Sequence, residues 1–251
     1  MFRALAMMTF ALGLALAVAQ PSAALDLNKM TDEERAIFRE EVRAFLMDDP
    51  QVIMDAVAVL EQRQQQAQVQ ADLSLVSDNA DAIFDDGFSF VDGNPDGDIT
   101  LVEFLDYRCG FCKRAHGEVA KLLESDGNIR LIVKEFPILG EQSLLASRFA
   151  IATKQVAGGE AYKNVADALM TLDGNVSMRS LRRMASTFGL DTDAIEARMD
   201  NPEVTEEIAQ TRALAQRLQI TGTPTFVLED ELLRGFLPYD QMRALVDEKR
   251  G

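Results

Sequence analysis

Two cysteines, Cys109 and Cys112, are separated by two residues and lie between an apolar run and a run compatible with a helix. The N-terminus of a helix carries unpaired N–H groups and a partial positive charge, so a thiol placed there ionises more readily. The thiolate is the form that attacks disulfides. The pattern therefore predicts thiol–disulfide chemistry, with Cys109 as the nucleophile and Cys112, one turn further along, as the resolving cysteine.

Two other uses of a Cys-x-x-Cys pair fit this chain less well. A structural zinc site needs four ligands, and the chain has no further cysteine and one histidine, His116. A purely structural disulfide across so short a loop adds little constraint.

His116 follows Cys112 by four residues on the same helical face. It could tune the thiolate or join the cysteines in binding Cu(I), but a solvated helix residue is the simpler interpretation.

One carboxylate lies within the apolar run before the cysteines. Glu103 interrupts the β-prone segment 99–105, six residues before Cys109. A carboxylate buried in a strand has a raised pKa and can exchange protons with a nearby thiol. Glutamate is more often exposed, so a solvent-facing position is the alternative, and only the spacing from the cysteines favours a catalytic role.

The elements around these residues predict an α/β fold. A strand at 99–105, a helix at 113–124 and a strand at 129–137 form a βαβ unit, whose strands should be parallel. Turn residues between Phe88 and Gly97 suggest a hairpin that leads into the first of these strands. Residues 141–218 are helical in pattern and form a helical insertion, and a closing helix is expected at 239–249.

The first residues and the composition indicate an exported acidic protein. Residues 1–24 combine an early arginine, an apolar run and small residues before the expected cleavage site after Ala24, as in a secretory signal peptide. Disulfides form and persist in the oxidising compartments to which proteins are exported. We expect this compartment to be the periplasm. The formal net charge of −16 argues against nucleic acid as a partner.

Residues 25–78 are expected to form helices outside a catalytic domain at 79–251. Thr31 and Glu34 fit a capping box, and Ile37, Phe38, Val42, Phe45 and Leu46 form an apolar stripe. A glutamine-rich stretch follows, which is either an exposed helical stalk or a linker. An amphipathic helix pair with no neighbour can bury its apolar faces against copies of itself. We therefore expect a homo-oligomer through residues 25–75; folding back onto the catalytic domain is the alternative.

Three separated motifs resemble the thioredoxin-fold disulfide oxidoreductases of the Dsb family (DsbA-like). They are the Cys-x-x-Cys run from Glu103, the pair Phe136-Pro137, and the segment 221–226, which contains Thr223 and Pro224. The resemblance implies a thioredoxin fold with an inserted helical subdomain, a buried carboxylate at Glu103, and a cis bond before Pro224 against the cysteines, where substrate binds. Spacing alone leaves that bond trans.

The segment Pro50–Leu60 is similar to the N-terminal part of copper-sensitivity suppressor C proteins, for which trimers are the described assembly. Gly110 and Phe111, between the cysteines and expected to contact substrate, resemble the pair found in periplasmic disulfide isomerases, as does Thr223 before the proline. The resemblance implies an oligomeric isomerase or reductase of exported proteins, with a membrane redox partner and no cofactor or resident metal. A DsbA-like monomeric oxidase and a periplasmic Cu(I)-binding copper-tolerance protein are the alternatives.

Overall fold

The structure is a computed structural model that describes Leu27 and residues 29–251. The expected signal peptide, residues 1–24, lies outside the described part. The described chain divides into two compact units, one ending at Gln62 and the other running from Arg63 to Gly251. Among residues 27 and 29–251, no helix is both long and apolar enough to cross a membrane.

The first unit contains α1 (Asp32–Asp48) and the beginning of α2 (Gln51–Asp78). Thr31 and Glu34 form the predicted capping box, in which each side chain accepts from the other residue's backbone N–H. α1 has no buried residue. The glutamine-rich stretch is helical, because α2 runs through it without a break.

The second unit contains a five-stranded sheet in the order β1-β3-β2-β4-β5. The central strands β2 (Ile99–Leu105) and β3 (Ile129–Glu135) are parallel and are joined by α4 (Gly110–Asp126), as the βαβ pattern predicts. β1 (Phe90–Gly93), β4 (Thr225–Leu228) and β5 (Glu231–Arg234) complete the sheet through antiparallel pairs. This is the thioredoxin fold that the sequence indicated.

The predicted hairpin between residues 88 and 97 is wrong. β1 pairs with β3, so β3 separates β1 from β2. The turn residues instead let the chain cross closely over the start of β3. A Cβ on Gly93 would lie 2.4 Å from the carbonyl oxygen of Ile129, and one on Gly97 would lie 2.5 Å from that of Asn128. Glycine, which has no Cβ, therefore lets the two backbone segments lie this close at both positions.

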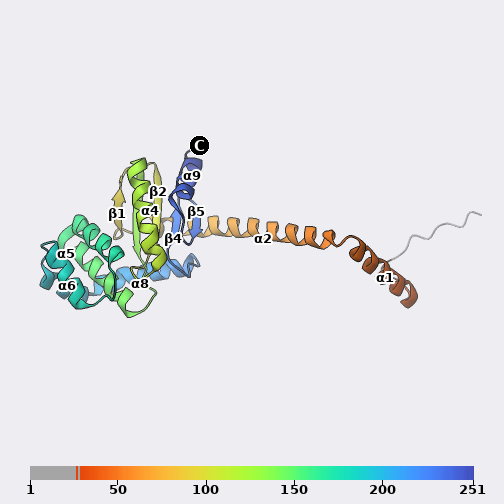
Figure 1. The fold of residues 1–251 in the computed structure, drawn as a ribbon, viewed down its shortest axis with the longest axis horizontal. Helices are drawn as coiled ribbons and strands as arrows, with labels where there is room; N and C mark the ends of the chain where they lie inside the picture. The colour runs from red at the N-terminus through yellow and green to blue at the C-terminus, as the bar shows by residue number, and fades with distance from the viewer. Residues whose placement is uncertain (1–26, 28) are drawn as a thin grey trace, which may run out of the picture. The chain divides into compact units, whose positions relative to one another are not determined.

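Helices cover both faces of the sheet. The odd-numbered residues of β2 and β3 face a core shared with α4, α5 (Glu141–Thr171) and α9 (Tyr239–Arg250), and the even-numbered ones face α3 (Ala80–Phe84) and α8 (Pro202–Arg217). With α6 (Met178–Thr187) and α7 (Thr192–Met199), α5 and α8 form the helical insertion between β3 and β4. Figure 1 shows α5 and α6 grouped on the opposite side of α4 from α9.

The last turns of α2 are attached to the sheet of the second unit. Val76 is 3% exposed and belongs to the core on the α8 side of the sheet. Asp72 accepts two hydrogen bonds from the guanidinium of Arg234 in β5, at 2.6 and 2.9 Å. A bidentate pair of this kind fixes both position and orientation. The end of α2 is therefore a structural part of this unit.

Candidate active site

Cys109 occupies the N-cap position of α4. It is 7% exposed, and its Sγ donates to the carbonyl oxygen of Thr223 over 3.1 Å. The first N–H groups of α4 have no partner within the helix, and the residue that carries this sulfur stands directly before them. The sequence expectation that Cys109 stands at the start of a helix agrees with this geometry.

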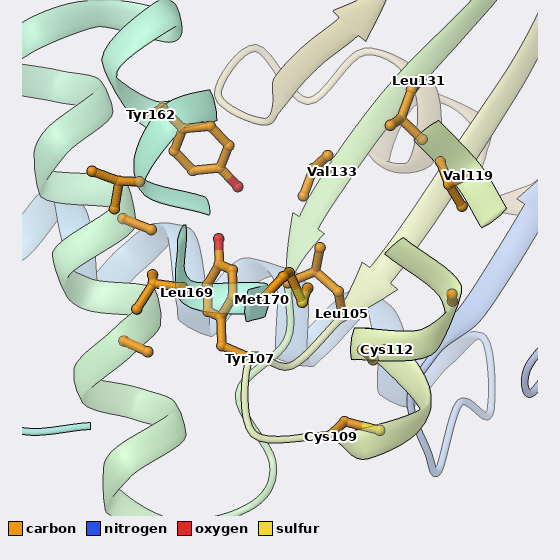
Figure 2. Close-up of a cluster of buried hydrophobic side chains, with 14 of the residues drawn as sticks. Leu105, Tyr107, Cys109, Cys112, Val119, Leu131, Val133, Tyr162, Leu169 and Met170 are labelled. Carbon is orange, nitrogen blue, oxygen red and sulfur yellow. The ribbon is translucent and has the colours of Figure 1, made fainter. Parts of the chain in front are cut away.

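Cys112 lies one turn inside α4 and is fully buried (Figure 2). Both cysteines are free thiols in this structure. Burial raises the pKa of the Cys112 thiol well above its usual value, and the charge of Glu103 adds to that shift. The two thiols thus differ in access, and the outer one is the better placed to meet a substrate disulfide.

The peptide bond between Thr223 and Pro224 is cis. It precedes β4, and the Thr223 carbonyl is the group that the Cys109 thiol contacts. Next to Cys109 in the chain, Gly110 has open space around its Cα, and Phe111 is 54% exposed beneath the guanidinium of Arg114, 4.3 Å from the ring centre. Exposed backbone and an exposed aromatic ring therefore flank the outer sulfur.

Glu103 lies in the buried face of β2 and is 4% exposed. Its Oε1 has no hydrogen-bond partner among the described residues, and burial raises the pKa of this carboxyl to about 8. The side chain borders a cavity of about 60 Å³, enough for water. The solvent-facing alternative considered from the sequence is thus excluded.

His116 borders the same cavity. Its side chain is 31% exposed, and Nε2 lies 3.4 Å from Oδ1 of Asp167 in α5. Burial lowers the pKa of His116, against the opposing charge of Asp167. The histidine is therefore a half-buried contact between α4 and α5, which differs from the solvated residue favoured by the sequence.

A second group of buried polar residues lies near the cysteines, and sequence reasoning missed it. Asp106 is fully buried and accepts from the backbone N–H groups of Arg108, Ile138 and Leu139. The next residue, Tyr107, donates to Glu135 at the end of β3. Asp106 stands in the Cys-x-x-Cys run itself, but two of its three partners, Ile138 and Leu139, lie 32 and 33 residues away, so only the fold reveals its role.

Comparison with known proteins agrees with this arrangement. The family described as DSBA-like thioredoxin domain matches residues 100–247, and the family described as Copper resistance protein ScsC N-terminal domain matches residues 34–67. The first match spans more than half of the chain and includes both cysteines and Pro224. The second covers most of α1 and the first half of α2.

Solved structures give the same picture. A thioredoxin-like oxidoreductase from Silicibacter pomeroyi DSS-3 is 45% identical and covers 68% of this chain and 98% of that chain, with a TM-score of 0.64. The thiol-disulfide exchange protein alpha-DsbA2 from Wolbachia pipientis is 30% identical over 72% and 97% of the two chains, with a TM-score of 0.68. Proteus mirabilis ScsC in a transitional conformation is 25% identical over 87% and 98%, with a TM-score of 0.64.

Among curated proteins, the chain is similar to part of much longer ones. The Na(+)/H(+) antiporter NhaA of Herminiimonas arsenicoxydans is 27% identical over 159 residues, which cover 63% of this chain and 25% of the antiporter. The chain thus matches about a quarter of the length of this relative.

Proposed function

This chain belongs to the DSBA-like thioredoxin domain family, and we propose that it is an exported thiol–disulfide oxidoreductase that acts as an oligomeric isomerase or reductase. The observation that carries the proposal is the placement of Cys109. Its sulfur lies at the N-cap of α4 and contacts the carbonyl of Thr223 beside the cis-proline loop. That arrangement offers one reactive sulfur and an adjacent backbone to which an extended substrate can bind.

In the proposed reaction, the Cys109 thiolate attacks one sulfur of a substrate disulfide. The substrate S–S bond breaks, a mixed disulfide forms, and the second substrate sulfur leaves as a thiolate. In reduction, Cys112 attacks Cys109, which releases the reduced substrate and leaves the Cys109–Cys112 disulfide. In isomerisation, a different substrate thiolate attacks the mixed disulfide and returns Cys109 to the thiolate, with no net change in oxidation state.

Cys112 must lose a proton before it can attack, and its burial opposes that loss. Glu103 is the buried carboxyl whose charge affects Cys112, and its pKa of about 8 suits proton exchange near neutral pH. We assign Glu103 as the acceptor of the Cys112 proton. We assign Thr223, Pro224, Gly110 and Phe111 to substrate binding, because they surround Cys109 and include exposed backbone and an exposed ring.

The proposed assembly involves residues 25–75, with a trimer favoured. Apolar side chains of α1 and early α2 are exposed in this structure, including Ile37 (68%), Phe45 (53%) and Leu60 (55%). The match to the ScsC N-terminal domain covers residues 34–67 of this segment. Several active sites in one oligomer raise the effective concentration of Cys109 around a bound substrate. We place the protein in the periplasm, with exported disulfide proteins as substrates and a membrane redox partner.

A disulfide-exchange assay tests the proposed function. The reduced full chain should reduce insulin and reactivate a scrambled disulfide protein. Cys109→Ser should abolish both activities. Cys112→Ser should abolish turnover in reduction but keep part of the isomerisation, because a substrate thiol can resolve the mixed disulfide. Full activity in Cys109→Ser would sink the proposal, and catalysis of oxidation alone would identify an oxidase instead.

Copper tolerance is a second candidate, which the match of residues 34–67 to a copper resistance family favours. Cys109 and Cys112 offer two soft sulfur ligands of the kind that Cu(I) prefers. Titration with Cu(I) in the presence of a competing chelator should show tight binding that is lost in the Cys109→Ser, Cys112→Ser variant. Binding no tighter than that of a simple dithiol would remove this candidate.

A further inference from the structure

Two of the three tyrosines in the chain donate to one buried carboxylate. The hydroxyl groups of Tyr107 and Tyr162 each lie 2.6 Å from Oε1 of Glu135. Glu135 is 7% exposed and each tyrosine 1%. Figure 2 shows the two rings on opposite sides of a gap, with their hydroxyl groups directed toward one another. A buried carboxyl is costly unless it is hydrogen-bonded, so these contacts are part of what keeps Glu135 in the core.

The two tyrosines come from different parts of the fold. Tyr107 stands two residues before Cys109, in the turn that the bond from the Cys109 N–H to the Asp106 carbonyl closes at 3.0 Å. Tyr162 belongs to α5, in the helical insertion. Glu135 is the last residue of β3. One carboxylate thus connects the loop that carries the nucleophile, the central sheet and the insertion.

We propose that Glu135 is a positioning residue for Cys109. Through Tyr107 it holds the turn that places Cys109 at the helix N-terminus and against the Thr223 carbonyl, and through Tyr162 it joins that turn to the insertion. The inference rests on the proposed function, since it explains how the attacking sulfur is kept in place. The rival account is that the three residues only stabilise the core.

The surroundings of Glu135 suggest that the strength of this contact varies near neutral pH. Burial raises the pKa of Glu135 to about 7, against the two tyrosine hydrogen bonds. Ser147 and Lys154 of α5 also lower the pKa of Glu135. Lys154 in turn pairs with Glu207 of α8 at 2.9 Å. Glu103 lies on the same face of the sheet as Glu135. The ionised carboxylate is the stronger acceptor, so the tyrosines should be held most firmly above pH 7.

The test is the rate at which Cys109 of the reduced full chain reacts with a small aromatic disulfide (Ellman's reagent). This reaction reports the thiol itself and needs no enzymatic turnover, so it separates this inference from the proposed function. Tyr162→Phe removes one hydroxyl without touching Cys109. We expect it to lower the rate constant about threefold or more, the size of effect that one hydrogen bond supports. Tyr239→Phe, at the remaining tyrosine, should leave the rate constant unchanged.

Three further variants separate positioning from stability. In a Glu135→Gln background, Tyr162→Phe should have little further effect, because the two residues act through one contact. The ratio of the wild-type rate constant to that of Glu135→Gln should rise between pH 6 and pH 8. If Tyr162→Phe lowers only the melting temperature and Cys109 reacts at the wild-type rate, the proposal is overturned. Tyr107→Phe, tested in the same way, decides the matter should Glu135→Gln fail to fold.

Discussion

At the scale of single residues, Glu103 shows what a buried carboxyl costs the fold. Its carboxyl is buried in β2 with an unpartnered oxygen, and burial alone accounts for the rise of its pKa to about 8. The usual value for a glutamate is 4.5. Between these two pH values the folded protein holds a proton that the unfolded chain has lost. Stability must therefore fall as the pH rises through that window.

Glu103→Gln should remove this penalty. At pH 4.5 and below, the side chain at position 103 is neutral in the folded wild type and in the folded variant. The pH-dependent contribution to the difference between their free energies of unfolding should therefore be small. Above pH 8 the folded wild type buries a charge that the variant lacks. The free energy of unfolding of the variant minus that of the wild type should therefore be larger at this pH than at pH 4.5, by on the order of a few kcal/mol.

Urea unfolding at a series of pH values measures this difference. Glu40→Gln, on the exposed surface of α1, is the matched control and should show no such trend. A free-energy difference between wild type and Glu103→Gln that stays constant from pH 4.5 to 8.5 would contradict the assignment of Glu103 as a buried carboxyl with a raised pKa.

At the scale of elements, a buried ion pair attaches the segment around α3 to the sheet. Lys134 of β3 is fully buried on the face opposite to α4, and its Nζ lies 2.5 Å from Oδ2 of Asp86 and 2.9 Å from the carbonyl of Ala82. Burial lowers the pKa of Lys134, and the hydrogen bond to Asp86 opposes that shift. The strand therefore depends on a short loop to neutralise a charge in its core.

Asp86→Ala should destabilise the protein by about 3–5 kcal/mol, because it leaves the Lys134 charge buried without its partner. The double variant Lys134→Met, Asp86→Ala should recover much of the loss, since it removes both charges. Asp85→Ala, at the exposed neighbour, is the control. Denaturant unfolding of the four proteins gives the comparison; equal losses in Asp86→Ala and Asp85→Ala would show that the pair contributes nothing.

The elements also show how far the sequence could lead. The cap at Thr31 and the βαβ unit follow local rules, and local rules predicted them correctly. The cis bond at Pro224 came only from resemblance. The partner of β1 and the two tyrosine contacts of Glu135 join residues far apart in sequence, so they depend on the sheet order and on which side chains face inward. No local pattern carries that information.

At the scale of the whole molecule, the two units differ in how they treat apolar surface. The second unit buries its apolar side chains in cores on both faces of the sheet. In the first unit, α1 buries none of its residues and exposes a stripe that includes Ile37, Phe38 and Phe45. Large exposed apolar surfaces usually mark sites of association, which is why we propose assembly through this unit.

Light scattering of residues 25–251 and of residues 63–251 tests the assembly. We expect a multimer for the longer chain and a monomer for the shorter one. The truncation ends at residue 62, because removal of Asp72 would leave Arg234 without its partner and expose the core near Val76.

A single substitution gives the same test without truncation. Phe38→Glu, in the exposed stripe, should dissociate the multimer, while Arg39→Glu beside it should not. A monomer for the unmodified chain 25–251 would refute the oligomeric proposal and favour an enzyme acting alone.

The pairing of Asp72 with Arg234 connects α2 to the cis-proline loop. Arg234 ends β5, and the next residue, Gly235, donates its N–H to the carbonyl of Pro224 over 3.0 Å. The last turns of α2 are thus linked to the cis-proline through one ion pair and one backbone hydrogen bond. The end of α2 and the sulfur of Cys109 are therefore the two ends of one series of contacts, which passes through Arg234, Gly235 and the cis-proline loop.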